Sequence, residues 1–222
     1  MAKWEDFYKY VRLDVQGCPI DIVKDSIRDA CIEFCEKSLI WQQERLCGDL
    51  VKDEHQYAYN TWGKDSTMVE PVTVIIRDKD LNGNLVQYPV AKTNRYDLDA
   101  LYPQWRLKKD KYPKFFYMED PNVICFVGTP SEDIVDAIHI LAAVKPTRDS
   151  DELPDFLLRD WAEVIASGAL SKLHSMVGKV WAKPNLTNFY IRKFTAGISR
   201  AKSKTYKSWV AQSKTMLPKR YF

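Results

Sequence analysis

The stretch IVDAIHILAAV (Ile134–Val144) decides the fold, because it is a strand-like run with no polar face. Side chains along a strand point alternately to its two faces, and here both sets are mostly apolar. One set is Ile138, Ile140, Ala142 and Val144, and the other is Ala137, His139, Leu141 and Ala143. A strand that is apolar on both faces lies inside a sheet that is covered on both sides. We therefore expect a central, covered strand here.

The chain ahead of this strand is rich in Val, Ile, Tyr and Thr, which favour strands. The predicted strands cover residues 46–52, 55–60, 69–77, 84–90, 115–118 and 123–127. Asp80-Leu81-Asn82-Gly83-Asn84 separates two of these runs and contains an Asn-Gly pair, so it predicts a β-hairpin. The side-chain oxygens of Asp78, Asp80 and Asn82 also resemble the start of a calcium loop, but Pro89 occupies its twelfth position, where such a loop needs a bidentate Glu. The hairpin is therefore favoured over a calcium site.

Three long helices are predicted before and after the strands. The predicted helices cover residues 19–43, 154–176 and 184–206, with shorter ones at 4–12 and 97–105. Each long helix has apolar residues three and four positions apart and a proline that suits its first turn. Asp97 is the expected cap of the short helix that follows it.

The second long helix contains a patch of small residues that predicts a helix crossing. The patch consists of Ala166, Ser167, Gly168 and Ala169. A glycine within a helix costs roughly 1 kcal/mol relative to alanine, so its presence favours close approach of another backbone. We expect the 19–43 helix or the third helix to cross there.

These elements predict an α+β protein: a helical bundle of three main helices with a β-rich insertion and an extended C-terminal arm. The expected divisions are 1–45 for the N-terminal helices of the bundle, 46–150 for the insertion, 151–206 for the C-terminal helices and 207–222 for the arm. The arm is expected because the helical periodicity fades after Tyr206.

Glu163 is the last acidic residue of the chain, and positive charge dominates everything after it. Residues 164–222 contain 12 of the 33 Lys and Arg and no Asp or Glu. The other 21 basic residues face 30 acidic ones, so residues 1–163 carry a net charge of −9 although the whole chain carries +3. This asymmetry favours a polyanionic or acidic partner for the C-terminal part, and it suits a head-to-tail contact between copies of the chain equally well.

No catalytic or metal-binding constellation is predicted. The five cysteines and three histidines show no ligand-like or catalytic spacing, and Cys31 and Cys35 are expected in the core. A catalytic pair of Cys125 and His139 on neighbouring strands is disfavoured. We therefore expect no enzyme activity, no metal and no cofactor. The chain begins without a leader-like segment and has no apolar run of membrane length, so we also expect no membrane partner.

Aromatic residues are interleaved with the basic residues of the C-terminal part. Tyr190 and Phe194 keep helical spacing, so we favour a core position for both. Trp209, Tyr221 and Phe222 lie beyond the periodic helix, and aromatic residues on an arm are typical anchors for a partner's pocket.

Several segments, taken in order, resemble the head-to-tail adaptor (connector) proteins of tailed bacteriophages. CPIDIVKDSIRDACIEFCEKSLIWQQE (Cys18–Glu44) resembles the family's first long helix, and LPDFLLRDWAEVIASGALSKLHSMVGKVWAKPNLTNFYIRKFTAGISRAKS (Leu153–Ser203) its closing helices, with the small-residue patch and the GK-x-W-x-x-P turn. DLDALYPQW and IHILAAVKPTRDSDELPD in the middle also fit. The resemblance spans about residues 4–205, and it departs from the family in the arm and in some insertion lengths.

The resemblance implies a structural virion protein, not an enzyme, that is made in the bacterial cytoplasm and assembled at the virion neck. It implies a ring, commonly a dodecamer, between the portal and the tail or nozzle proteins. DNA passes through this ring without sequence-specific binding. The arm is expected to dock on the portal protein. The residues expected to contact the portal are Lys202, Lys204, Lys207, Trp209, Met216, Leu217, Pro218, Lys219, Arg220, Tyr221 and Phe222.

The alternative is a nucleic-acid-binding protein that grips phosphates with its basic C-terminal helix. It predicts duplex binding that falls steeply with salt. The net acidity of residues 1–163 and the lack of a recognised DNA-binding motif count against this alternative.

Overall fold

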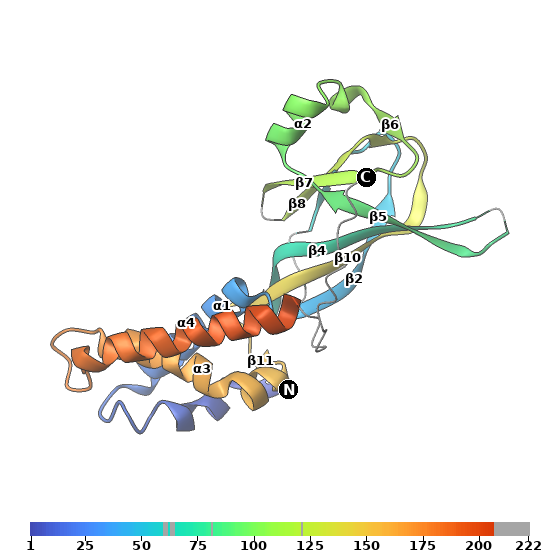
Figure 1. Ribbon diagram of the computed structural model, residues 1–222. Coiled ribbons are helices and arrows are strands. Elements are labelled where there is room, and N and C mark those ends of the chain that lie inside the picture. Colours follow the sequence, from blue (N-terminus) through green and yellow to red (C-terminus); the bar gives the residue numbers. More distant parts are fainter. Residues whose placement is uncertain (60–61, 63–64, 81, 121, 207–222) are drawn as a thin grey trace, which may run out of the picture. The chain divides into compact units, whose positions relative to one another are not determined.

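The computed structural model describes residues 1–59, 62, 65–80, 82–120 and 122–206 (Figure 1). Its contacts group the chain into two units. The first unit consists of Met1–Trp4 and Trp41–Leu157, and the second of Glu5–Ile40 with the chain from Leu158 onward. The first unit is built mainly on strands and the second on helices.

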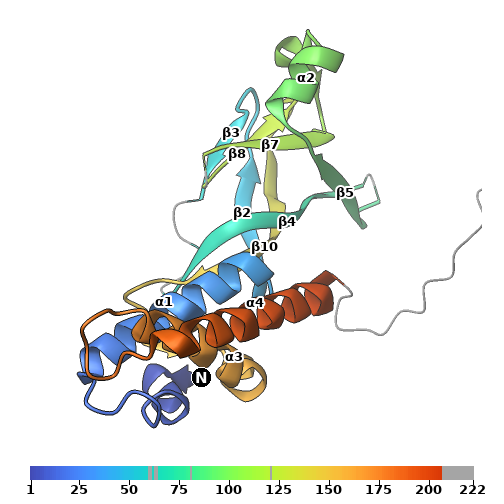
Figure 2. The ribbon, with the colours of Figure 1, turned by 60° about the vertical axis from the view of Figure 1, so that its left-hand side comes forward.

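A curled sheet of seven strands forms the centre of the first unit (Figure 2). In spatial order its strands are β2 (Gln42–Leu50), β10 (Ile134–Pro146), β4 (Ser66–Lys79), β5 (Leu85–Lys92), β7 (Phe115–Asp120), β8 (Val123–Val127) and β3 (Gln56–Ala58). Neighbouring strands are antiparallel, except that β5 and β7 are parallel. Two further short pairs are β1 (Ala2–Lys3) with β11 (Glu152–Leu153), antiparallel, and β6 (Lys109–Asp110) with β9 (Thr129–Pro130), parallel.

β10 is an interior strand, as its two apolar faces predict. It pairs with β2 on one side and with β4 on the other. Ile138, Ile140, Ala142 and Val144 are completely buried, and so are Ala137 and Ala143 on the opposite face. Its pairing with β2 is irregular near Asp136, whose φ is 53° and whose backbone N–H donates to Asp49 at 2.7 Å.

β4 and β5 form the predicted hairpin. They pair antiparallel, with Asp78 opposite Val86. The Asp80 carboxylate accepts hydrogen bonds from the backbone N–H of Asn82 at 2.9 Å and of Asn84 at 2.8 Å. The Asp80 oxygens, which resembled calcium ligands, therefore hold the turn itself.

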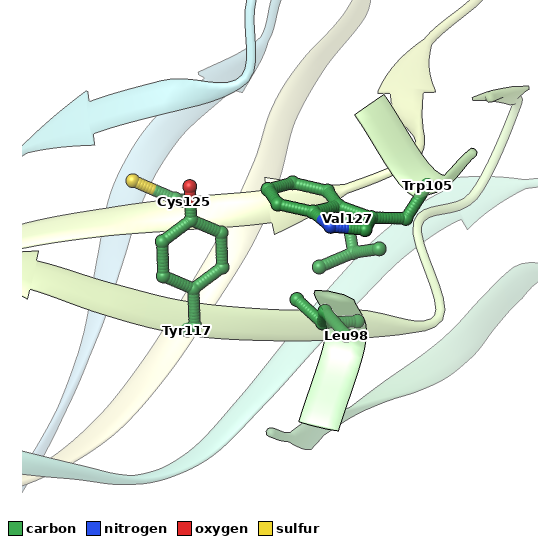
Figure 3. Packing of buried hydrophobic residues seen from close by; sticks show 5 residues of the cluster. All are labelled: Leu98, Trp105, Tyr117, Cys125 and Val127. Carbon is green, nitrogen blue, oxygen red and sulfur yellow. The ribbon is translucent and has the colours of Figure 1, made fainter. Parts of the chain in front are cut away.

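A small lobe of α2 (Arg95–Leu101) and the 3₁₀ helix η2 (Trp105–Leu107) packs on β7 and β8 (Figure 3). Its buried cluster consists of Leu98, Trp105, Tyr117, Cys125 and Val127. The ring of Trp105 meets Tyr117 edge to face, with 5.6 Å between the ring centroids. The Trp105 indole N–H donates to Asp99 at 2.9 Å, so the indole nitrogen of this buried ring has a partner.

The second unit is built on the 3₁₀ helix η1 (Trp4–Tyr10), α1 (Ile20–Ser38), α3 (Asp155–His174) and α4 (Pro184–Tyr206). α1 and α4 lie side by side, and α3 packs against both (Figures 1 and 2). Phe34 of α1 stacks obliquely on Trp161 of α3 with 5.3 Å between ring centroids, and both side chains are buried.

The predicted fold class, a three-helix bundle with a β-rich insertion, is wrong, while the predicted C-terminal arm lies outside the described residues. The chain is a mixed α/β protein in which the seven-stranded curled sheet is a principal element. Two features of the first unit were underestimated. β4 and β10 are long, and the N-terminal strand β1 pairs with β11, so the strand-based unit also takes the first residues of the chain. Pairing between residues so far apart in sequence leaves little local signal.

Two helix boundaries also differ from the prediction. α1 ends at Ser38 rather than near residue 43, because Leu39 adopts the left-handed conformation (φ 55°) and its N–H bonds to the Cys35 carbonyl. The chain then enters β2 at Gln42. The cap of α2 is Asn94 and not Asp97, since the Asn94 side chain accepts the Asp97 backbone N–H at 2.8 Å. The remaining predicted strands and helices are present, with ends shifted by a few residues.

Candidate functional site

The candidate site is the outer side of α4, the helix that carries most of the described basic residues of the acid-free C-terminal quarter. α4 begins at Pro184, whose missing N–H costs nothing in a first turn. Only Phe194, Gly197 and Ala201 are buried along its length. A Cβ at Gly197 would collide with the methyl groups of Val164, so α4 lies very close to α3 there. α4 is therefore held on one side and exposed on the other.

The predicted small-residue patch lies where the three helices meet. Ala166, Ser167 and Ala169 are buried in α3. A Cβ at Gly168 would lie 2.9 Å from Ala30 Cβ of α1 and 2.8 Å from the ring of Phe194 of α4. Both neighbouring helices thus approach the same glycine. The patch positions α4 and does not face a ligand.

Part of the positive charge of α4 is used within the second unit. The Lys193 Nζ lies 3.6 Å from the Glu163 carboxylate of α3. The Arg200 guanidinium and the Lys204 ammonium both lie 5.3 Å from the centre of the Trp161 ring. Such cation–π contacts are worth about 0.5–1 kcal/mol at exposed sites. These three residues help to fix α4 on α3.

Arg192 and Lys202 are different, because neither forms an ion pair or ring contact within the described ranges. Both are exposed on α4. Phe189, which is 59% exposed, and Tyr206, which is 90% exposed, lie on the same helix. Large exposed aromatic residues beside unpaired cations are typical of a surface that binds a partner.

The neighbouring helix α1 has the opposite charge on its outer side. Asp21, Asp25 and Glu36 are exposed there. Asp29 and Glu33 approach Lys172 of α3, with Glu33 at 3.5 Å, and Glu33 also accepts Lys37 at 2.6 Å. Burial alone would raise the pKa of Glu33, but Lys37 and Lys172 together bring this pKa below its ordinary value. Glu33 is thus held ionised by its neighbours.

Of the residues expected to contact the portal, the structure describes two. Lys202 and Lys204 are exposed on the last turns of α4. Lys207, Trp209, Met216, Leu217, Pro218, Lys219, Arg220, Tyr221 and Phe222 lie outside the described residues.

The first unit contains a hollow of about 690 Å³ that the sequence did not predict. The lobe of α2 and η2 forms its walls, with Leu98, Trp105 and Val127 from the cluster of Figure 3 among the lining residues. Leu101 and Tyr102, which are exposed, stand at the same hollow. The apolar residues of LYPQWRL were the available signal, but only the packing of α2 over β7 and β8 shapes the hollow.

Cys125 and His139 are not brought together. Cys125 lies on β8 and His139 on β10, which are separated by three strands of the sheet. His139 Nδ1 pairs with Arg77 at 2.9 Å, and burial together with the Arg77 charge lowers the pKa of His139. Burial raises the pKa of Cys125, so this thiol is not activated as a nucleophile.

Among the residues that the structure describes, no three His, Cys, Asp or Glu side chains lie close enough to hold a metal ion. Within the same ranges, no helix is both long enough and apolar enough to cross a membrane.

No family model matches the sequence of this chain, and no curated protein matches it either.

Proposed function

We propose that the chain is a structural protein of the neck of a tailed bacteriophage, which forms a ring between portal and tail and docks on the portal through residues 207–222. The resemblance of residues 4–205 to the adaptor family suggests this role. The observation that carries it is the one-sided attachment of α4. A rigid helix, packed on α3 at Gly197 and Gly168, presents a basic and aromatic outer side and leads directly into the basic C-terminal segment.

The charge distribution supports the same role. Residues 1–163 carry a net charge of −9, which suits a channel component that DNA passes without sticking. The basic residues that follow suit attachment to an acidic protein surface. A ring multiplies each contact, so modest attraction per copy gives a durable assembly.

Removal of residues 207–222 tests the docking step. Because the truncated chain retains α4 (Pro184–Tyr206) and its contacts with α3, it is expected to keep its unfolding midpoint. It is expected to lose binding to purified portal of the same phage, measured by co-sedimentation and by electron cryo-microscopy of the neck. The matched control keeps the length and replaces Ser208 and Ser213 by Ala, which leaves the basic and aromatic residues in place. Full portal binding by the truncated chain contradicts the proposed dock.

The exposed Arg192 and Lys202 also support a second candidate, non-specific binding of nucleic acid along α4. Each phosphate contact that is neutralised adds close to one unit to the slope of log affinity against log salt. Duplex DNA binding with a steep salt slope, lost on Arg192→Gln with Lys202→Gln, favours this candidate over the neck protein.

A further inference from the structure

The outer side of α4 has no partner in the described chain, and its exposed groups indicate what chemistry a partner surface needs. It combines the exposed cations Arg192 and Lys202 with the exposed rings of Phe189 and Tyr206. A partner surface must therefore be acidic, helical or flat, and able to cover apolar groups. The outer side of α1 meets these conditions, because Asp21, Asp25 and Glu36 are exposed there and Ile32 is half-buried beside them.

The spacing of the charges agrees on the two helices. Asp25 and Glu36 are eleven positions apart, which is three helical turns and about 16 Å, so both lie on one line of α1. Arg192 and Lys202 are ten positions apart, which corresponds to about 15 Å along α4 and leaves them about 80° apart around its axis, on either side of the line of Tyr206. The axial spacing therefore matches, and the long cationic side chains span the difference in direction when the helices lie alongside each other.

These two surfaces cannot meet within one chain. α1 and α4 already face each other and α3 through their buried sides, since Ala30 and Phe194 both reach Gly168. Their outer sides consequently point away from this common core. Complementary surfaces that lie apart on one molecule can be satisfied by other copies, and a repeated contact of this kind closes into a ring or grows into a filament.

We infer that the outer side of α4 in one copy binds the outer side of α1 in the next copy, with Arg192 and Lys202 opposite Asp25 and Glu36. This inference rests on the proposed ring and names the surfaces that build it. Phe189 and Tyr206 flank the ion pairs and are covered by the neighbouring copy, which adds apolar burial to the electrostatic attraction.

Charge reversal tests this contact. One chain carries Arg192→Glu with Lys202→Glu, and a second carries Asp25→Lys with Glu36→Lys. Each alone brings like charges together and is expected to lower the self-association constant at least about tenfold, by sedimentation velocity with and without portal. An equimolar mixture of the two is expected to associate again, because each reversed α4 then meets a reversed α1. This recovery also shows that both variants are folded.

The outcomes separate the contact from the proposed function. If the wild-type chain forms rings and neither reversal weakens them, the α1–α4 contact is wrong while the neck role stands. If the reversals weaken self-association but the mixture does not restore it, the contact is also wrong. Loss of DNA binding by the Arg192→Glu, Lys202→Glu variant then assigns the outer side of α4 to nucleic acid instead. A wild-type chain that stays monomeric alone and on portal overturns both the contact and the ring.

Discussion

α3 and α4 are neighbouring helices of 20 and 23 residues that the second unit uses in opposite ways. α3 buries Trp161, Ile165, Ala169 and Leu173 among many others, and its sides are enclosed by α1 and α4. α4 buries only Phe194, Gly197 and Ala201 and leaves its basic side exposed. Burial concentrates stability in α3 and its contacts, whereas exposure leaves α4 available for binding. Substitutions matched between the two environments can test this contrast.

The largest effect is expected for Phe194→Ala, which removes a buried ring from the crossing at Gly168. Truncating a buried phenylalanine costs about 3–5 kcal/mol of unfolding free energy, because transfer energy is lost and a cavity remains. Phe189→Ala, five positions earlier on the same helix and 59% exposed, is the control and is expected to cost less than about 0.5 kcal/mol. Chemical denaturation measures both. Equal losses in the two variants contradict the one-sided attachment of α4.

The next effect concerns Gly168→Ala, where the usual preference is expected to reverse. Alanine normally stabilises a helix by about 1 kcal/mol over glycine. Here its Cβ would lie 2.9 Å from Ala30 Cβ and 2.8 Å from the Phe194 ring, so we expect a net loss of about 2 kcal/mol. The mirror control is Ala196→Gly on the exposed side of α4, which is expected to lose only the helix preference, about 1 kcal/mol. A more stable Gly168→Ala protein shows that the helices do not approach there.

The smallest effect is the pH dependence of the Glu33 contacts with Lys37 and Lys172. The pKa of Glu33 in the folded chain lies below its ordinary value of 4.5. Its stabilisation is therefore fully present above that ordinary value and is lost as the pH falls through the folded pKa. Glu33→Gln is expected to lower the thermal midpoint slightly at pH 7, and the difference from wild type is expected to vanish once the pH has fallen below the folded pKa of Glu33. A difference that persists at low pH assigns the effect to packing.

The sequence predicted the elements better than their assembly. Alternation of apolar residues in Ile134–Val144 was enough to predict an interior strand, since a period of two is a local property. The Asn-Gly turn predicted the β4–β5 hairpin for the same reason. The end of α1 was misplaced because Leu39 ends the helix in a left-handed conformation that leucine rarely adopts. The fold class was wrong because the strands between residues 42 and 146 join into one seven-stranded sheet, and pairings such as β2 with β10 connect residues far apart in sequence.

Some features of the candidate site also follow from the sequence, whereas others depend on how the helices pack. That the C-terminal quarter is basic follows from composition alone, and so does the exposure expected of Lys202 and Lys204. Which cations remain without a partner does not follow from composition. Arg200 and Lys204 lie over Trp161, and Lys193 approaches Glu163, only because α3 and α4 pack together. The hollow beside α2 also depends on tertiary packing, because it forms where α2 lies over β7 and β8.

The sequence by itself determined where strands and helices form and that positive charge gathers after Glu163, because periodicity, turn residues and charge are read along the chain. Only the tertiary structure decided that β10 has β2 and β4 as neighbours, that Gly168 touches two helices, and that Arg192 and Lys202 stay outside every described ion pair. Those features depend on distances between residues far apart in sequence, and packing of the buried faces sets these distances.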